Sequence, residues 1–341
     1  MAYTTIKKPS DYFNTTLWTG TGSSMTITGV GHQPDFTWIK PRSVADNHVL
    51  FDSVRGVTKR LVSNSTSAEG TVSDMITSFD SDGFSLGTNS NVTGSGRTFV
   101  GWNWLASNTT ASNTDGDITS TVSANTTSGF SIVSYTGTGS NATVGHGLSS
   151  APAMVIIRSR DDVNNWRVGH NGLTDWSYRI NLESTGAQGA QADVFNSTAP
   201  TSSVFSVGTS GSTNGSGKAY ISYCFADVKG FSKFGSYTGN GNADGTFVYT
   251  GFKPAFVMVK VTNTVNQWGM FDNKREGYNV ANDILTANTS DAESTGAYFD
   301  ILSNGFKARS TSGVTNSSGN NFIYMAFAEE PLVGDNPATA R

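Results

Sequence analysis

The sequence predicts an all-β protein built from three tandem antiparallel β-sandwich repeats. Three observations lead to this prediction: a composition dominated by small polar residues, a set of landmarks that recurs three times in one order, and short apolar runs separated by turn residues. Of the 341 residues, 154 (about 45%) are Ser, Thr, Asn or Gly, whereas 14% are charged and 11% are aromatic.

This composition disfavours both helix and disorder. Ser, Thr and Asn disfavour helix because their side chains hydrogen bond to the nearby backbone, and Gly disfavours it because its flexible backbone loses more entropy on ordering. Thr also suits pleated strands. Disordered chains are usually rich in charge and short of aromatic residues, and this chain is neither. Its hydrophobic share of 36% is enough for about three cores of ordinary domain size.

Four landmarks recur in the same order along the chain. The first is an aromatic residue followed by Thr-Gly-x-Gly, at Trp18, Tyr135 and Tyr237. The second is a proline before an apolar strand, at Pro34, Pro152 and Pro254. The third lies fourteen residues after that proline, at His48, Trp166 and Trp268. The fourth is a final aromatic-rich strand, at residues 99–104, 220–225 and 322–327. Chance similarity does not conserve both order and spacing, so the chain contains three copies of one unit.

These landmarks divide the chain into repeats of about 100 residues with short connecting segments. The expected repeats span residues 12–107, 129–228 and 229–332. Residues 1–11 are expected to be an N-terminal attachment segment, and residues 333–341 a C-terminal tail. Residues 108–128 are rich in Ser, Thr and Asn, which is typical of a linker or an extended surface strand.

Period-two alternation identifies the core face of the final strand in each copy. The large apolar positions are Val100, Trp102, Trp104, Ile221, Tyr223, Phe225, Ile323, Met325 and Phe327. The residues between them are mostly small or polar, so the large set is expected to face the core. Residues 255–259 are apolar at nearly every position, which predicts a central strand covered on both faces. Residues 80–83 and 303–305 are expected to be hairpin turns.

Histidine and cysteine offer no convergent site in the sequence. His32, His48, His146 and His170 do not share the spacing that a zinc or His-dependent site needs, so structural or surface roles are expected. Cys224 lies between two predicted core aromatics with no recurring His or Asn partner, which favours a buried inert thiol.

An Asp/Arg pair at three-residue spacing occurs in the first and third copies. The pairs are Asp52 with Arg55 and Asp272 with Arg275, whereas the second copy has His170 at the matching position. The favoured interpretation is a local ion pair that fixes a turn, and the alternative is a ligand clamp. The absence of the pair from copy two argues against a mechanism shared by all three copies.

Two further kinds of side chain could in principle act on sugars. The acidic pairs Asp80 with Asp82 and Asp161 with Asp162 could serve glycoside hydrolysis, but both lie in turn-like segments where solvated caps are more common. Asp-Ser-Asp-Gly at 80–83 lacks the other acidic positions of a calcium loop. The rings that could stack on sugars belong to Trp166, Trp176 and Trp268. Trp166 and Trp268 occupy the same repeat position, which favours a core role for these two. No catalytic, cofactor-binding or metal-binding residue is therefore predicted, and no ligand-binding residue is assigned.

Charge and hydropathy exclude two classes of partner. The net charge is −4, from 26 acidic and 22 basic residues with no block of like charge, which disfavours a nucleic-acid surface. No run approaches the roughly 18 apolar residues needed to cross a bilayer, so membrane insertion is not expected. Lys7 and Lys8 are followed by no apolar core, so no signal peptide is visible.

The repeat motifs resemble those of tail-fibre-like virion proteins of tailed, particularly marine, bacteriophages. The similar segments are the aromatic-Thr-Gly-x-Gly openings and residues 31–36, 52–57, 81–87, 251–256 and 328–331. The resemblance spans about residues 12 to 331 and describes scaffold, and the family offers no catalytic residues to carry over.

The resemblance implies a non-enzymatic virion structural protein, a tail fibre or similar appendage involved in host attachment, without a cofactor. It implies synthesis in the host cytoplasm, a place on the virion surface, tail or capsid proteins as partners, and a host cell-surface glycan or protein as target. Homo-oligomerisation, for instance as a trimer, fits such a fibre, although no heptads enforce it. The alternatives are a capsid decoration or head-fibre protein and, from another class, a polysaccharide depolymerase or carbohydrate-binding module.

Overall fold

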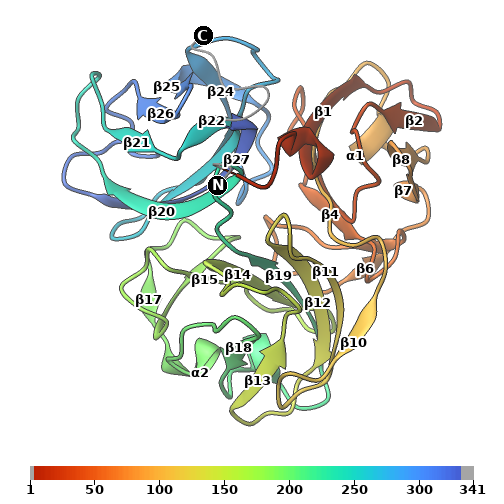
Figure 1. Cartoon of the computed structure of the whole chain (residues 1–341). Coiled ribbons are helices and arrows are strands. Elements are labelled where there is room, and N and C mark those ends of the chain that lie inside the picture. Colours follow the sequence, from red (N-terminus) through yellow and green to blue (C-terminus); the bar gives the residue numbers. More distant parts are fainter. Residues whose placement is uncertain (1–3, 332–341) are drawn as a thin grey trace.

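The strands of the chain form three lobes that surround a common centre (Figure 1). The computed structural model describes residues 4–331, so the predicted tail at 333–341 and the first three residues of the attachment segment lie outside it. Within the described residues there are 27 strands, three α-helices of four residues each and one 3-10 turn. The all-β prediction is confirmed.

The bounds of the elements are as follows. Lobe 1 contains η1 (Pro9–Asp11), β1 (Phe13–Thr19), β2 (Met25–Thr28), β3 (Phe36–Pro41), β4 (Val49–Asp52), β5 (Lys59–Arg60), β6 (Gly70–Thr71), β7 (Ile76–Asp80), β8 (Gly83–Leu86), α1 (Ser90–Thr93) and β9 (Thr98–Trp104). Lobe 2 contains β10 (Ala111–Asn113), β11 (Ser120–Asn125), β12 (Phe130–Thr136), β13 (Ala142–Gly145), β14 (Met154–Ser159), β15 (Arg167–His170), β16 (Tyr178–Asn181), β17 (Gly189–Ala190), α2 (Ala192–Phe195), β18 (Val204–Val207), α3 (Gly211–Asn214) and β19 (Ala219–Phe225). Lobe 3 contains β20 (Ser232–Thr238), β21 (Phe247–Tyr249), β22 (Phe252–Val261), β23 (Trp268–Asp272), β24 (Ala281–Thr286), β25 (Ser294–Leu302), β26 (Gly305–Ala308) and β27 (Asn321–Pro331).

Each lobe contains the same antiparallel arrangement of four strands. The strand orders are β1-β9-β3-β4 in lobe 1, β12-β19-β14-β15 in lobe 2 and β20-β27-β22-β23 in lobe 3. The final strand of each lobe therefore lies between the strand that carries the opening aromatic residue and the strand at the landmark proline. Every residue of β22 is buried, which confirms the prediction of a central strand there. The predicted hairpins also form, since β7 turns into β8 and β25 turns into β26.

The lobes differ in what surrounds this unit. Lobe 1 adds a separate sheet, β2-β8-β7, whereas lobe 2 adds strands to the main sheet and a separate pair, β13 with β18. Lobe 3 continues through eight hydrogen-bonded strands from β20 to β21. The segment predicted as a linker, 108–128, contains β10 and β11, and β11 pairs along its whole length with β12. Of the two interpretations, the extended strand is observed and the linker is not, because this segment forms the edge of the lobe 2 sheet.

The opening landmark has one structural role in all three lobes. The side chains of Trp18, Tyr135 and Tyr237 donate hydrogen bonds to the backbone carbonyls of Val92, Thr213 and Thr315. The first glycine of each landmark lies against the turn that carries this carbonyl. A Cβ on the one in lobe 1, Gly20, would come within 2.3 Å of the Gly94 carbonyl oxygen. The landmark thus joins the strand that carries its aromatic residue to the turn before the last strand of the lobe, and glycine is needed for the close approach.

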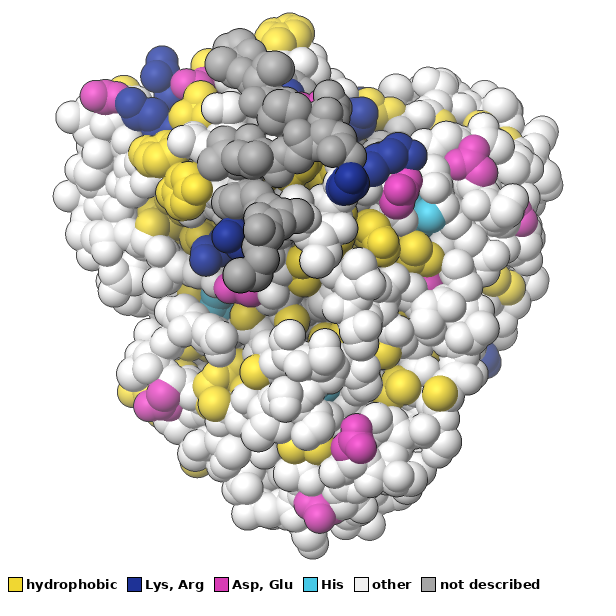
Figure 2. Space-filling view, in the orientation of Figure 1, with side chains coloured by type: hydrophobic (Ala, Val, Ile, Leu, Met, Phe, Trp, Pro, Cys, Tyr) yellow, Lys and Arg dark blue, Asp and Glu magenta, His cyan; other side chains and the backbone are white. Residues whose placement is uncertain are grey.

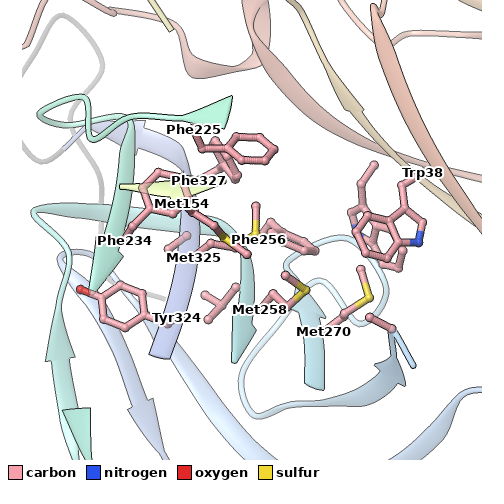
Figure 3. Close-up of a cluster of buried hydrophobic side chains, with 14 of the residues drawn as sticks. Trp38, Met154, Phe225, Phe234, Phe256, Met258, Met270, Tyr324, Met325 and Phe327 are labelled. Atoms are coloured by element: carbon pink, nitrogen blue, oxygen red, sulfur yellow. The ribbon is translucent and has the colours of Figure 1, made fainter. Parts of the chain in front are cut away.

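The centre of the molecule is an aromatic cluster to which all three lobes contribute. The rings of Trp104, Phe225 and Phe327, equivalent residues of the three final strands, lie 6.3, 5.7 and 6.0 Å apart, centroid to centroid. Figure 3 shows part of this cluster, where Phe225 and Phe327 lie beside Phe256 and the methionines of lobe 3. The three lobes therefore share one core instead of following one another as separate beads.

The predicted core-facing residues are all buried, but the core they face is the shared one. All nine belong to the central cluster. The opposite face of the same strands packs into the lobes, where Phe99 joins a cluster private to lobe 1, and Tyr220 and Cys224 join one private to lobe 2. Alternation in the sequence identified which side chains share a face, and the assembly of the lobes decided what covers that face.

Candidate functional site

The Asp/Arg pair of lobe 1 is buried where lobe 1 meets lobe 2. Arg55 Nε lies 2.5 Å from Asp52 Oδ2, and both side chains are fully buried. The Arg55 guanidinium also contacts Glu69, which in turn binds Arg160 of lobe 2 at 2.9 Å. The Tyr223 hydroxyl, also from lobe 2, donates to Asp52 Oδ2 over 2.8 Å. The pair is thus part of a charge network between lobes.

The pair of lobe 3 repeats this arrangement against lobe 1. Arg275 Nε lies 2.7 Å from Asp272 Oδ2, and its Nη1 lies 2.9 Å from Glu293. Glu293 binds Arg42 of lobe 1 at 2.6 Å. Trp102, the lobe 1 equivalent of Tyr223, donates from Nε1 to Asp272 Oδ2 over 3.1 Å. Both pairs also fix their turns, since Asp Oδ1 accepts from the backbone N–H of the Arg.

The interface between lobes 2 and 3 is neutral at the matching positions. His170 replaces the aspartate, and its Nε2 lies 3.1 Å from the carbonyl oxygen of Tyr324 in lobe 3. Met325 stands where lobes 1 and 2 have Trp102 and Tyr223, and a thioether cannot donate a hydrogen bond. Copy two thus lacks the Asp/Arg pair at the interface where the facing side chain, Met325, could not donate a hydrogen bond to an aspartate.

These contacts leave the Asp/Arg pairs closed to a ligand. The side chains of Asp52, Arg55, Asp272 and Arg275 are at most 1% exposed, and their polar atoms are engaged within the protein. The ion-pair interpretation agrees with this geometry and the clamp does not. What the sequence could not indicate is that each pair joins two lobes.

The shared position fourteen residues after the proline also connects neighbouring lobes. Trp166 Nε1 donates to the Val62 carbonyl of lobe 1 over 3.0 Å, and Trp268 Nε1 donates to the Asn181 carbonyl of lobe 2 over 2.9 Å. Both indoles are buried, and Trp176 is only 7% exposed. None of the three tryptophans suggested for sugar stacking is available for it.

The third member of this position, His48, shows which ring nitrogen carries the proton. Trp38 Nε1 donates to His48 Nδ1 over 2.8 Å, so His48 Nε2 carries the hydrogen and donates to the Thr286 carbonyl of lobe 3 over 3.0 Å. Burial lowers the pKa of all four histidines, to about 4 for His32 and His170. They are neutral structural residues at physiological pH.

The acidic pairs serve turns and inter-strand contacts. The Asp82 carboxylate accepts hydrogen bonds from the backbone N–H groups of Gly29 and Gly31, which lower its pKa. Asp161 accepts from the Ala219 N–H, and Asp162 pairs with Lys218 at 2.9 Å. Asp80 likewise accepts from the hydroxyls of Ser78 and Ser85, so these acids have the local structural roles that the sequence favoured.

Cys224 and metal ligands add no reactive centre. Burial raises the pKa of the Cys224 thiol to about 12, so it is protonated at neutral pH. Within residues 4–331, His, Cys, Asp and Glu side chains form no group of three able to hold a metal ion. In the same part of the chain, no helix has the length and apolar character to span a membrane.

Sequence reasoning missed a buried cation at one repeat position. The side chains six residues after each proline are Lys40, Arg158 and Lys260, and all three are fully buried. Each donates a hydrogen bond across an interface to a backbone carbonyl of a neighbouring lobe: Lys40 to Ser290 of lobe 3, Arg158 to Thr66 of lobe 1 and Lys260 to Thr185 of lobe 2. The signal was present as a basic residue at the same place in all three copies.

The aromatic side chains left exposed among the described residues belong to lobe 3: Tyr278, which is 70% exposed, and a pair on β21. Phe247 and Tyr249 of β21 are 45% and 54% exposed, whereas Val248 between them is buried. Figure 2 shows apolar side chains on the molecular surface over β21. Next to Tyr249 is a hollow of about 460 Å³, lined also by Asp227, Ser232 and Lys233.

Comparison with known proteins yields one match. A family model described as a domain of unknown function (DUF7483) matches residues 8–331. No curated protein and no solved structure matches the chain.

Proposed function

Since the chain belongs to the family described as a domain of unknown function (DUF7483), we propose its function from its sequence and architecture. It is a non-enzymatic structural protein of a bacteriophage virion, a tail fibre or similar surface appendage, and it takes part in attachment to the host. Its partners are other virion proteins and a component of the host surface, and it is located on the virion.

One observation supports the structural, non-enzymatic part of this proposal most directly. The side chains that could have supplied chemistry, namely the Asp/Arg pairs and the histidines, are buried and engaged in structural contacts, several of them between lobes. The acidic pairs are held in turns. What the protein offers to its surroundings is a large polar surface on a three-lobed scaffold, which suits binding and building.

The first experiment measures where the protein is and what it contacts. Antibodies against the purified protein are used for immunogold labelling of virions, and the purified protein is tested for competition with phage adsorption to host cells. Tail labelling together with competition supports the proposal. Absence from the virion, or no effect on adsorption, contradicts it, and labelling of the head supports the capsid decoration alternative.

A second measurement addresses the enzymatic alternative. Purified protein is incubated with host capsule and lipopolysaccharide, and new reducing ends are quantified. Release would replace the proposal with a depolymerase.

The oligomeric state is measured by light scattering on the same preparation. The central core closes within one chain, so a homotrimer would need contacts outside this core.

A further inference from the structure

The exposed aromatic residues of β21 replace polar or small residues in the other two lobes. The three equivalent strands are aligned by their buried central residue, which pairs with a phenylalanine of the neighbouring strand: Ile27 with Phe84, Val144 with Phe205 and Val248 with Phe306. By this register, the positions of Phe247 and Tyr249 correspond to Thr26 and Thr28 in lobe 1 and to Thr143 and Gly145 in lobe 2. The strand therefore forms without aromatic residues there.

The two rings project from the same side of β21. Residues two apart on a strand share a face and lie about 7 Å apart, so one extended ligand can contact both rings. About half of each side chain is exposed to water, and this exposed apolar area does not stabilise the fold. Their presence in lobe 3 alone points to a contact outside the chain.

Polar groups suited to sugar hydroxyls lie beside the rings. The Asp227 carboxylate, whose Oδ1 accepts from the Phe234 N–H over 2.7 Å, has its Oδ2 4.0 Å from Lys233 Nζ. Both side chains are nearly half exposed and line the hollow next to Tyr249. A carboxylate that accepts and an ammonium that donates can together bind neighbouring hydroxyls of one sugar. Beyond Phe247, its cross-strand neighbour Lys307 pairs with Asp244 and adds a polar rim.

We propose that Phe247, Tyr249 and the adjoining hollow at Asp227 and Lys233 form a binding site for an uncharged oligosaccharide. The rings of β21 stack on sugar faces, and Asp227 with Lys233 binds the hydroxyls of the unit that enters the hollow. This inference rests on the proposed function, because it names the class of host component that the protein contacts. Oligosaccharide binding by the purified protein tests the site separately from that function.

The test uses saturation-transfer NMR on the full chain with maltohexaose, N-acetylchitohexaose and mannohexaose as neutral probes and sialyllactose as an acidic probe. We expect transfer to at least one neutral probe. Phe247→Thr with Tyr249→Thr, which introduces the lobe 1 residue types, should weaken binding about tenfold or more. Asp227→Asn should also weaken it, while its amide oxygen can still accept from the Phe234 N–H.

The matched control is Thr26→Ala with Thr28→Ala at the equivalent strand of lobe 1, and binding should be unchanged. Thermal melting confirms that each variant is folded. The site is wrong if no neutral probe receives transfer, if the Phe247 and Tyr249 variant binds as well as the parent, or if only sialyllactose binds and is released at about 0.5 M salt.

The outcomes separate this site from the proposed function. A protein that competes with phage adsorption but binds no neutral oligosaccharide leaves the proposed function standing and removes the site. A protein that binds oligosaccharide through β21 but is absent from virions keeps the site and removes the proposed function.

Discussion

Trp102 of lobe 1 donates a hydrogen bond from its indole Nε1 to Oδ2 of Asp272 in lobe 3, over 3.1 Å and away from solvent. The equivalent Tyr223 makes the same kind of contact from lobe 2 to Asp52 in lobe 1. The same repeat position thus donates a hydrogen bond to a buried carboxylate of a neighbouring lobe at two of the three interfaces. At the third interface the equivalent residues are Met325, which has no donor, and His170, which replaces the aspartate.

Removing the indole donor should weaken the whole protein. Trp102→Phe leaves an oxygen of Asp272 without this hydrogen bond, so we expect the free energy of unfolding to fall by about 2 to 4 kcal/mol, lost ring volume included. Urea denaturation measures it. Met325→Leu, at the equivalent position without a donor, is the control and should cost less than about 1.5 kcal/mol. Equal losses for the two variants would contradict a role for the hydrogen bond.

The arginines of the buried pairs should matter more than any surface charge. Arg275→Met leaves Asp272 buried without its cation, and we expect a loss of about 3 to 5 kcal/mol in the free energy of unfolding. Adding Asp272→Asn should recover part of it, because the buried negative charge is removed. Lys218→Met breaks an exposed pair and should cost less than about 1 kcal/mol. If Arg275→Met proves as mild as Lys218→Met, the network is not a stabilising element.

Stability should increase from pH 8 to pH 10. Burial lowers the pKa of Lys40 and Lys260 to about 8, and both titrate near 10.4 in the unfolded chain. Between these values the unfolded state binds more protons than the folded state, so the free energy of unfolding rises with pH, by up to about 2 kcal/mol per lysine at pH 9.5. Above about pH 10, buried tyrosines such as Tyr223, whose pKa is raised, reverse the trend.

Equilibrium unfolding at pH 7.5 and 9.5 measures this rise, and the double variant Lys40→Met with Lys260→Met is the matched test. It should lose most of the pH dependence in this window. A parent protein whose stability is flat from pH 8 to 9.5 would mean that the lysines keep their ordinary pKa in the folded state.

Acid should destabilise the protein before its carboxylates titrate. The pKa of His170 is lowered by burial to about 4, whereas histidine in the unfolded chain titrates near 6.5. As the pH falls between these values, the unfolded state takes up protons that the folded state does not, so the free energy of unfolding decreases, by at most about 3 kcal/mol for this group. His170→Gln should make the profile between pH 6.5 and 4.5 shallower, and the slope that remains comes from His32, His48 and His146, whose pKa burial also lowers. A slope unchanged in this variant would contradict a contribution from His170.

The shared core predicts that the three lobes unfold together. Trp104, Phe225 and Phe327 contact one another at the centre, so the loss of one lobe exposes central buried surface of the other two. We expect one calorimetric transition, and Phe225→Ala should move all of it to lower temperature, with a cost of about 3 to 5 kcal/mol. Three separate transitions, with only one shifted by the variant, would show independent repeats.

Features that depend on neighbouring residues along the chain could be predicted from the amino-acid sequence. Small polar residues excluded helix, alternation identified the face that carries Trp102 and Trp104, and the turns at 80–83 and 303–305 followed from their Gly and Asp content. The Asp/Arg spacing correctly indicated a turn-fixing ion pair. These are local signals, since side-chain direction and turn geometry repeat over two to four residues.

What covers each strand face, and which side chains remain exposed, depends on the packing of the three lobes and could not be predicted from local sequence. Period two cannot distinguish a core inside one repeat from a core shared by three, because both bury the same residues of β9. It cannot show that Arg160 belongs with Glu69, which lies 91 residues earlier in another lobe. Nor could it separate buried Trp166 from exposed Tyr249, because the exposure of an aromatic ring is set by the elements that pack on it from distant parts of the chain.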